Sequence, residues 1–260
     1  MSLNGDSRRK HIHIGIATFA DVDPEVMASM MSWSFHLGRR MREYDFSNSI
    51  APKMAQWRAK NQLVENAKYM RADYLLVLDD DMLLNIDMDW MRVLLKHDKD
   101  VIGPIYFQRG GNYHPVIMKA IRGTRAHKNE LHFEFYERGE LSDGLMQVDV
   151  LGGGCQLIKM EVFTKIISPY FFENGVHGQD VYFCQKVREA GMESYVDTSV
   201  QVGHMVRDRY TLTRETLPSD DFIKSTPYYK LYQERNEDTR RDIAAPSLVP
   251  EDGAGRNIVA

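Results

Sequence analysis

Three adjacent carboxylates, Asp79, Asp80 and Asp81, directly follow the apolar run YLLVL. The length and branching of that run predict a buried strand that ends in acidic residues. Two carboxylates about 4 Å apart repel each other by roughly 4 kcal/mol at a surface-like dielectric, so water, a proton or a cation must offset their charge. If the strand continues, Asp79 and Asp81 point to one side and Asp80 to the other. The triplet predicts either a solvated turn or a site for Mg²⁺ or Mn²⁺, which take oxygen ligands and substrate phosphates.

Two side chains far along the chain are candidates for the same chemistry. Asp180 stands in HGQD, just before the helical pattern VYFCQKVREAG. It is either the N-cap of that helix or a general base that the helix dipole keeps ionised. His204 follows a predicted strand through one glycine, Gly203. A lone histidine is more often structural, but as a third ligand His204 would complete a mixed oxygen and nitrogen site for Mn²⁺.

Gly152, Gly153 and Gly154 follow a predicted strand but lack the spacing of a dinucleotide or Walker motif. Three glycines at a strand end indicate that something packs directly against the backbone. Arg58 lies on a predicted helix beside its apolar stripe. It is either an ordinary surface arginine or a ligand for a phosphate or a uracil carbonyl.

The first half of the chain predicts alternating strands and helices. We expect strands near residues 12–16, 43–46, 74–79 and 101–106, and helices from Pro24, over Pro52–Met70 and over Asp89–His97. This βαβαβαβ order is typical of a parallel sheet wrapped by helices.

The second half changes character, with a hairpin-like region and then shorter elements. We expect a strand at Met146–Val150, helices at Lys159–Ile167 and Gln179–Ala190, and a last strand at Tyr195–Val202. Few large apolar residues follow Arg235, so a disordered or wrapping tail is expected. The predicted organisation is a flexible N-terminus (1–10), one domain (11–210) and a C-terminal extension (211–260).

Length, composition and net charge limit the classes of protein to which this sequence can belong. A chain of 260 residues with 43% hydrophobic residues can bury a sufficient core without disulfides or a structural metal. Its net charge of -4 argues against a surface designed as a whole for nucleic acid. Cys155 and Cys184 are expected to be reduced structural thiols in a cytoplasmic protein. No apolar stretch approaches the roughly 18–20 residues that span a bilayer.

Five segments in order carry a resemblance to a known family: HIHIGIATF, RAKNQLVENAKYMRADYLLVLDDDM, VIGPIY, VLGGGCQLIKMEVF and GQDVYFCQKVREAGMESYVDTSVQVGHM. Over residues 12–205 the chain resembles GT-A fold glycosyltransferases of the family-two-like, inverting kind, including small forms from phages and bacteria. The resemblance implies an α/β fold with a Rossmann-like, mostly parallel twisted sheet flanked by helices. It also implies a nucleotide-sugar donor, with UDP the expected nucleotide, and Mn²⁺ or Mg²⁺ as cofactor.

The resemblance also implies roles for single residues. Asp79 and Asp81 would serve the metal and the ribose, His204 would complete the metal shell, and Asp180 would be the catalytic base. The donor-binding set that it implies is Thr18, Phe19, Arg58, Asp79, Asp80, Gly152, Gly153 and Gly154. Two positions depart from the family pattern: Gln179 stands where glutamate is usual, and Ala17 stands where proline is common.

Two other interpretations of the sequence remain open. One is a nucleotidyltransferase on the same kind of sheet, and the other is a non-catalytic module that binds a sugar nucleotide or glycan. The acceptor is also open between a glycan, a protein, a lipid-linked sugar and a hydroxylated DNA base. The basic stretches HLGRRMR and KAIRGTRAHK suit either a phosphate backbone or a solvated surface.

Overall fold

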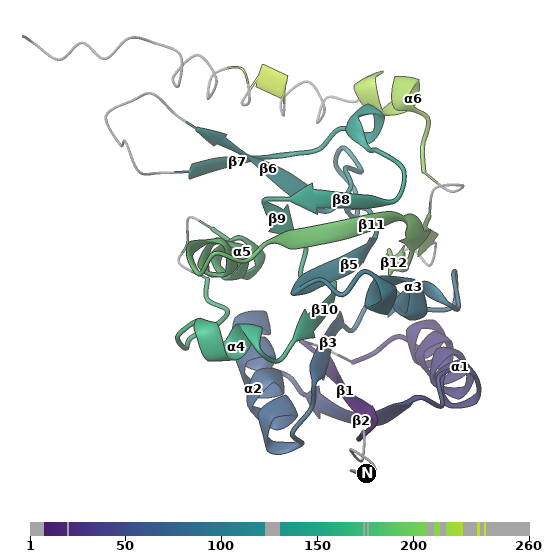
Figure 1. Ribbon diagram of the computed structural model, residues 1–260. Helices are drawn as coiled ribbons and strands as arrows, with labels where there is room; N and C mark the ends of the chain where they lie inside the picture. The colour runs from purple at the N-terminus through teal and green to yellow at the C-terminus, as the bar shows by residue number, and fades with distance from the viewer. Residues whose placement is uncertain are drawn as a thin grey trace, which may run out of the picture.

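The computed structural model describes residues 8–19, 21–122, 131–173, 175, 177–206, 211–213, 217–225, 233–234 and 237. Its centre is a seven-stranded sheet in the order β2-β1-β3-β10-β5-β11-β8 (Figure 1). Five of the seven strands run in one direction, and only β10 and β8 oppose them. The strands are β1 (Lys10–Ala17), β2 (Tyr44–Ala51), β3 (Tyr74–Asp79), β5 (Val101–Ile105), β8 (Leu145–Val148), β10 (Cys155–Lys159) and β11 (Ser194–Gln201). The mostly parallel α/β sheet predicted from the sequence is confirmed.

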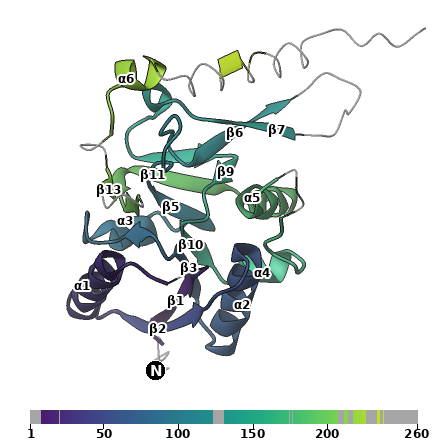
Figure 2. The ribbon, with the colours of Figure 1, turned by 180° about the vertical axis from the view of Figure 1, so that it is seen from behind.

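Helices cover both faces of this sheet, so the sheet lies between two hydrophobic cores (Figures 1 and 2). One face carries α1 (Pro24–Arg40) and α3 (Trp90–Lys96). The other carries α2 (Gln56–Tyr69), α4 (Val162–Lys165) and α5 (Gln179–Glu189). Strand β3 supplies both cores by alternation: Leu75 and Val77 face α2, whereas Leu76 and Leu78 pack in the core with α1.

Two small sheets flank the main one. The first joins β4 (Met82–Leu83), β12 (Gly203–Met205) and β13 (Thr211–Leu212), and the second joins β6 (Ile117–Arg122), β7 (Leu131–Phe135) and β9 (Val150–Leu151). A 3-10 turn, η1 (Arg138–Glu140), and the short helix α6 (Asp220–Ser225) lie next to the second sheet. An ion pair of 3.3 Å from Arg138 Nη2 to Asp220 Oδ1 ties α6 to η1.

The predicted strand Met146–Val150 is two strands that belong to different sheets. Asp149 separates them, and its Oδ2 accepts a hydrogen bond of 2.7 Å from the Ala120 amide of β6. Asp149 Oδ1 lies 3.1 Å from Arg188 Nη1 of α5. The chain therefore leaves the main sheet at Asp149 and joins the second sheet before the three glycines.

Three predicted elements need correction. The helix expected at Lys159–Ile167 is the end of β10 followed by the one-turn helix α4. Only Lys159 of the expected range belongs to β10; a turn at residues 160–161 precedes α4, and the extended backbone of Ile166 ends it. The helix expected from Pro52 begins at Gln56, because Lys53 has a positive φ of 52° that no helix accommodates. The strand before the carboxylates ends at Asp79 and does not continue to Asp81.

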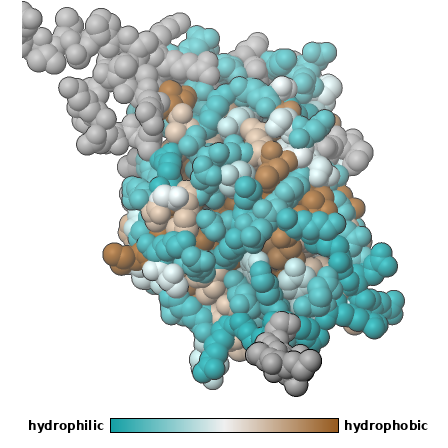
Figure 3. Space-filling view, viewed as in Figure 1, coloured by the Kyte–Doolittle hydropathy of each residue, from teal (hydrophilic) through white to brown (hydrophobic). Residues whose placement is uncertain are grey.

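The surface and the cysteines agree with the other sequence expectations. Figure 3 shows a mainly hydrophilic face with small hydrophobic groups between the polar side chains. No helix in the ranges given above has the length and apolar character that crossing a bilayer requires. Cys155 and Cys184 are both buried and free.

Candidate active site

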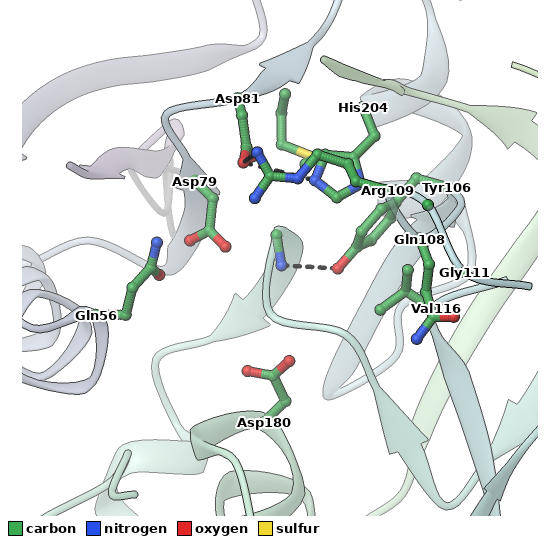
Figure 4. Close-up of a pocket in the computed structure, with 13 residues that line it drawn as sticks. Gln56, Asp79, Asp81, Tyr106, Gln108, Arg109, Gly111, Val116, Asp180 and His204 are labelled. Carbon is green, nitrogen blue, oxygen red and sulfur yellow. Dashed lines mark hydrogen bonds and ion pairs between the residues drawn. The ribbon is translucent and has the colours of Figure 1, made fainter. Parts of the chain in front are cut away.

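The described residues enclose a cavity of about 560 Å³ at the carboxyl ends of β3 and β5. Open α/β sheets place ligands at this edge, because parallel strands deliver their following loops to one side. Figure 4 shows Asp180 pointing into the cavity from α5, on the side opposite Asp81, Arg109 and His204. The cavity is lined by Gln56, Asp79, Asp81, Met82, Tyr106, Gln108, Arg109, Gly110, Gly111, Val116, Gly154, Asp180 and His204.

The three carboxylates form a turn rather than an extended strand. Asp79 is the last residue of β3, and Asp80 and Asp81 turn the chain into β4. Asp79 and Asp81 nevertheless both line the cavity, and Asp80 Oδ2 accepts a hydrogen bond of 3.0 Å from the Phe19 amide. The turn thus delivers the two carboxylates to one place by a different geometry from the predicted alternation.

Lys60 is a fully buried lysine that faces this site from α2. Its ammonium lies 3.2 Å from Asp79 Oδ1 and donates a hydrogen bond of 2.8 Å to the Gly153 carbonyl. Burial raises the pKa of Asp79 to about 7; the Lys60 charge opposes this rise, and the Asp81 and Asp180 charges add to it. Lys60 is therefore the basic partner of Asp79 at the inner wall of the cavity.

Asp180 lies in the first turn of α5 and reaches back to the glycines. Its Oδ1 would be 2.6 Å from a Cβ on Gly153, and Lys60 Nζ would be 2.4 Å from the same point. Only glycine therefore lets the lysine and the carboxylate approach each other over the backbone. Gly178 is the N-cap, so the reading of Asp180 as the cap is wrong. Asp180 Oδ1 is buried, and no described group donates a hydrogen bond to it.

His204, Asp81 and Arg109 form the opposite wall. His204 Nδ1 is 2.7 Å from the Phe107 carbonyl, which accepts only, so Nδ1 carries the proton. Nε2 then faces Asp81 Oδ2 at 3.5 Å, and the Arg109 guanidinium lies 2.8 Å from the same oxygen. Burial raises the pKa of Asp81, but the hydrogen bond and charge of His204 and the charges of Arg109 and Lys60 bring it below its usual value.

Tyr106 fills the space behind the glycines. Its hydroxyl accepts a hydrogen bond of 2.9 Å from the Gly154 amide, and burial raises its pKa well above the usual value. A Cβ on Gly152 would meet that hydroxyl at 2.4 Å. The packing expected against the three glycines thus comes from the protein's own side chains, and of the three only Gly154 lines the cavity.

Six residues of the expected donor set lie outside this lining: Thr18, Phe19, Arg58, Asp80, Gly152 and Gly153. Thr18 is buried, Phe19 is 68% exposed beside the acidic turn, and Arg58 lies over the Trp57 ring, 5.0 Å from its centroid. Two other carboxylates of the second half of the chain, Asp149 and Glu173, also lie outside the lining. Of these, Asp149 is already held by Arg188 and the Ala120 amide.

The residues present suit a hard divalent cation in part. Asp81 Oδ1 is buried without a hydrogen-bond donor among the described groups. Because Nδ1 donates to the Phe107 carbonyl, His204 would bind a metal through Nε2, in its deprotonated form. No set of three described His, Cys, Asp or Glu side chains is arranged to hold a metal ion unaided. A cation here would take its other ligands from a bound phosphate and water, as Mg²⁺ and Mn²⁺ commonly do.

Sequence reasoning missed Lys60, Tyr106 and Arg109. For Lys60 a signal existed, because it falls three residues after Trp57 and four before Val64, inside the apolar stripe of the helix. A lysine at a core position of a helix indicates a buried partner. The sequence around Tyr106 and Arg109 contains no comparable signal, because their partners, Gly154 and Asp81, come from other parts of the chain.

Comparisons with known proteins give similarity in fold. No protein-family model matches the sequence, and no curated protein matches it. The crystal structure of A197 from STIV matches with a TM-score of 0.54 and 18% identity, over 80% of this chain and 92% of that one. The structure of GalNAc-T7 with UDP, GalNAc and Mn²⁺ matches with a TM-score of 0.50 and 13% identity, over 90% of this chain and 52% of that one.

The chain thus spans about half the length of the GalNAc-T7 chain. UDP-glucose pyrophosphorylase complexed with UDP-glucose has a TM-score of 0.45. At these identities the similarity shows the fold alone. That fold is of the GT-A, nucleotide-diphospho-sugar transferase type, as the sequence predicted.

Proposed function

We propose that the protein is a glycosyltransferase that moves a sugar from a nucleotide-sugar donor, a UDP-sugar, to an acceptor hydroxyl with inversion. One observation carries this proposal: Asp180 Oδ1 is buried without a hydrogen-bond donor among the described groups, and the carboxylate faces Asp79 and Asp81 across one cavity. A transferase of this kind needs a metal-binding carboxylate group and a separate base. The cavity provides both from different elements.

The donor half of the site would be built on the acidic turn. Asp79, Asp81 and His204 would hold Mn²⁺ or Mg²⁺, which supplies Lewis-acid stabilisation of the departing diphosphate. The GalNAc-T7 structure holds UDP and Mn²⁺ on the same fold and supports this assignment. Lys60 keeps a positive charge next to Asp79 before any ligand arrives.

The nucleoside would lie at the outer side of the turn. Phe19 is exposed there, and the Asp80 carboxylate fixes its amide. An exposed aromatic ring held by its backbone suits stacking against a base. Thr18 precedes Phe19 and remains in the proposed donor set, as does Arg58. Of the glycines, Gly154 would meet the donor, whereas Gly152 and Gly153 make room for the side chains that surround it.

The acceptor half belongs to Asp180. Its carboxylate takes the proton of the acceptor hydroxyl while that oxygen forms a bond to the anomeric carbon. The bond from that carbon to the diphosphate oxygen breaks, and the electron pair leaves with the nucleoside diphosphate. A single displacement inverts the anomeric configuration.

A panel of nucleotide sugars tests the reaction class. Each donor is incubated with the protein and Mn²⁺, with and without glycan, peptide and hydroxymethylated-DNA acceptors, and products are identified by mass spectrometry. We expect nucleoside diphosphate and a glycosylated acceptor from at least one combination. Pyrophosphate made from a nucleoside triphosphate and a sugar phosphate would instead indicate a nucleotidyltransferase. Donor binding without turnover in any combination would indicate a binding module.

A further inference from the structure

Arg109 occupies the position that a cation would take at Asp81. Its Nη1 lies 2.8 Å from Asp81 Oδ2, the oxygen that also faces His204 Nε2 at 3.5 Å. Among the described residues, nothing donates a hydrogen bond to the second oxygen, Oδ1. The guanidinium therefore neutralises the outer carboxylate of the turn, as Lys60 neutralises the inner one.

The two basic residues differ in their freedom to move. Lys60 is completely buried and bonded to the Gly153 carbonyl. The Arg109 side chain is 44% exposed and precedes Gly110 and Gly111, which adopt φ values of 75° and 66°. Glycines in this conformation let a loop turn back sharply. Because the Arg109 side chain is partly exposed, it can leave Asp81 for another anionic partner while staying in contact with water.

We propose that Arg109 exchanges partners during donor binding: it pairs with Asp81 in the empty site and with the diphosphate of the donor in the loaded site. This inference rests on the proposed function. A divalent cation at Asp81 would repel the guanidinium, which already lines the same cavity. Its planar fork of N–H donors matches phosphate oxygens, which an ammonium matches less well. Arg109 thus competes with the metal and assists the nucleotide.

This double role predicts that loss of Arg109 changes the affinity for the metal and the affinity for the diphosphate in opposite directions. Without Arg109, the metal alone meets no competitor at Asp81, so it binds more tightly. Without Arg109, the diphosphate loses charged hydrogen bonds, so it binds less tightly once metal is present. A hydrogen bond to a charged group is worth about 1.5–3 kcal/mol, or roughly a ten- to hundredfold change in affinity. A residue with a purely structural role would weaken both.

Arg109→Gln is the test variant, and Arg39→Gln, an exposed arginine on α1, is the charge-matched control. Electron paramagnetic resonance measures Mn²⁺ binding without nucleotide. Calorimetry measures UDP and inorganic pyrophosphate at saturating Mn²⁺. We expect Arg109→Gln to bind Mn²⁺ severalfold more tightly and both diphosphates about tenfold or more weakly. The control should match the wild type in all three titrations.

Two failures are distinguishable. If the wild type binds UDP and pyrophosphate but Arg109→Gln binds both equally well, the role of Arg109 is overturned and the proposed function stands. Weaker Mn²⁺ binding by Arg109→Gln would overturn the exchange as well. If the wild type binds neither UDP nor pyrophosphate with Mn²⁺, the proposed function fails together with this inference.

Discussion

At the scale of single residues, Lys60 explains how two carboxylates from distant parts of the chain share one cavity. It pairs with Asp79 at 3.2 Å and donates to the Gly153 carbonyl at 2.8 Å, and the Asp180 carboxylate lies over the same glycine. A buried lysine is costly unless its charge is paired. Here the acidic site supplies the pairing, and the lysine in turn lowers the repulsion between the carboxylates.

Substitutions can distinguish the role of the proposed base from the roles of the residues that bind the donor. Asp180→Asn keeps the side-chain volume but cannot accept a proton, so transfer should fall by roughly 10²–10⁴. Donor affinity should stay close to wild type, whereas Asp81→Ala and His204→Ala should each weaken metal-dependent donor binding. Titration of donor and quantification of product on all three variants give the comparison. Normal transfer by a folded Asp180→Asn would remove its assignment as the base.

Gly153 tests the close packing of Lys60 and Asp180 over one backbone position. In Gly153→Val the Cβ would meet Lys60 Nζ at 2.4 Å and Asp180 Oδ1 at 2.6 Å, which are the far ends of flexible side chains. The Asp180 end points into the cavity and can be displaced there, so we expect a folded protein whose transfer rate falls at least about tenfold because the base is displaced. Gly139→Ala, where a Cβ would meet nothing within 4 Å, is the control. Wild-type turnover by Gly153→Val would show that the close approach is dispensable.

The sequence predicts those site residues that stand in a recognisable local pattern. Asp79 and Asp81 end a buried strand, Asp180 begins a helix, and His204 follows a strand and a glycine. Lys60 meets Gly153 across 93 positions of sequence, and no local pattern carries that pairing. Long-range contacts such as this are fixed by the order of strands in the sheet, which the sequence alone left undetermined.

At the scale of elements, periodicity predicted β1, α1, α3 and β5 well because each has a clear apolar face and a terminal signal. For α1 the signal is Asp23, whose carboxylate accepts a hydrogen bond of 2.8 Å from the Glu25 amide. Strand β10 was missed because it runs antiparallel between β3 and β5, is buried on both faces, and includes the polar Gln156. Such a run carries no period from which a strand can be told apart from a helix.

The end of α3 is tied to β11 by an ion pair that should make stability depend on pH. His97 Nε2 lies 2.7 Å from Asp197 Oδ2, and Ser199 donates two hydrogen bonds to Oδ1, at 2.8 Å and 2.6 Å. Burial raises the pKa of Asp197, but the bonds from Ser199 and His97 lower it below its usual value of 3.8. The ionised carboxylate therefore contributes stability above the unfolded-state pKa, and this contribution is lost as pH falls through the folded-state pKa.

Asp197→Asn should reduce the free energy of unfolding by about 1.5–3 kcal/mol at pH 7, the value of a hydrogen bond to a charged group. The difference from wild type should persist down to about pH 5 and shrink below it. Urea unfolding across this range measures it. Asp45→Asn, an exposed partner of Arg9, is the control and should change stability by less than about 1 kcal/mol. A difference that does not vary with pH would show that the Asp197 charge is not its source.

At the scale of the whole molecule, the sheet separates two cores and brings their loops together at one edge. One core packs under α2, α4 and α5, and the other under α1 and α3. The acidic turn follows β3 and the proposed base belongs to α5, so the cavity lies where the carboxyl ends of the central strands meet elements of both halves. This arrangement is what the proposed transfer requires, with donor and acceptor arriving from different sides.

Phosphorus NMR of the protein with Mg²⁺ and the donor selected by the panel tests the central claim most directly. We expect the two diphosphate resonances of the nucleotide sugar to be replaced by those of the nucleoside diphosphate in the presence of acceptor, and EDTA to stop the change. Asp180→Asn should leave the donor spectrum unchanged over the same time. Formation of nucleoside triphosphate and sugar phosphate from the donor and pyrophosphate, at the same rate in wild type and Asp180→Asn, would contradict glycosyl transfer.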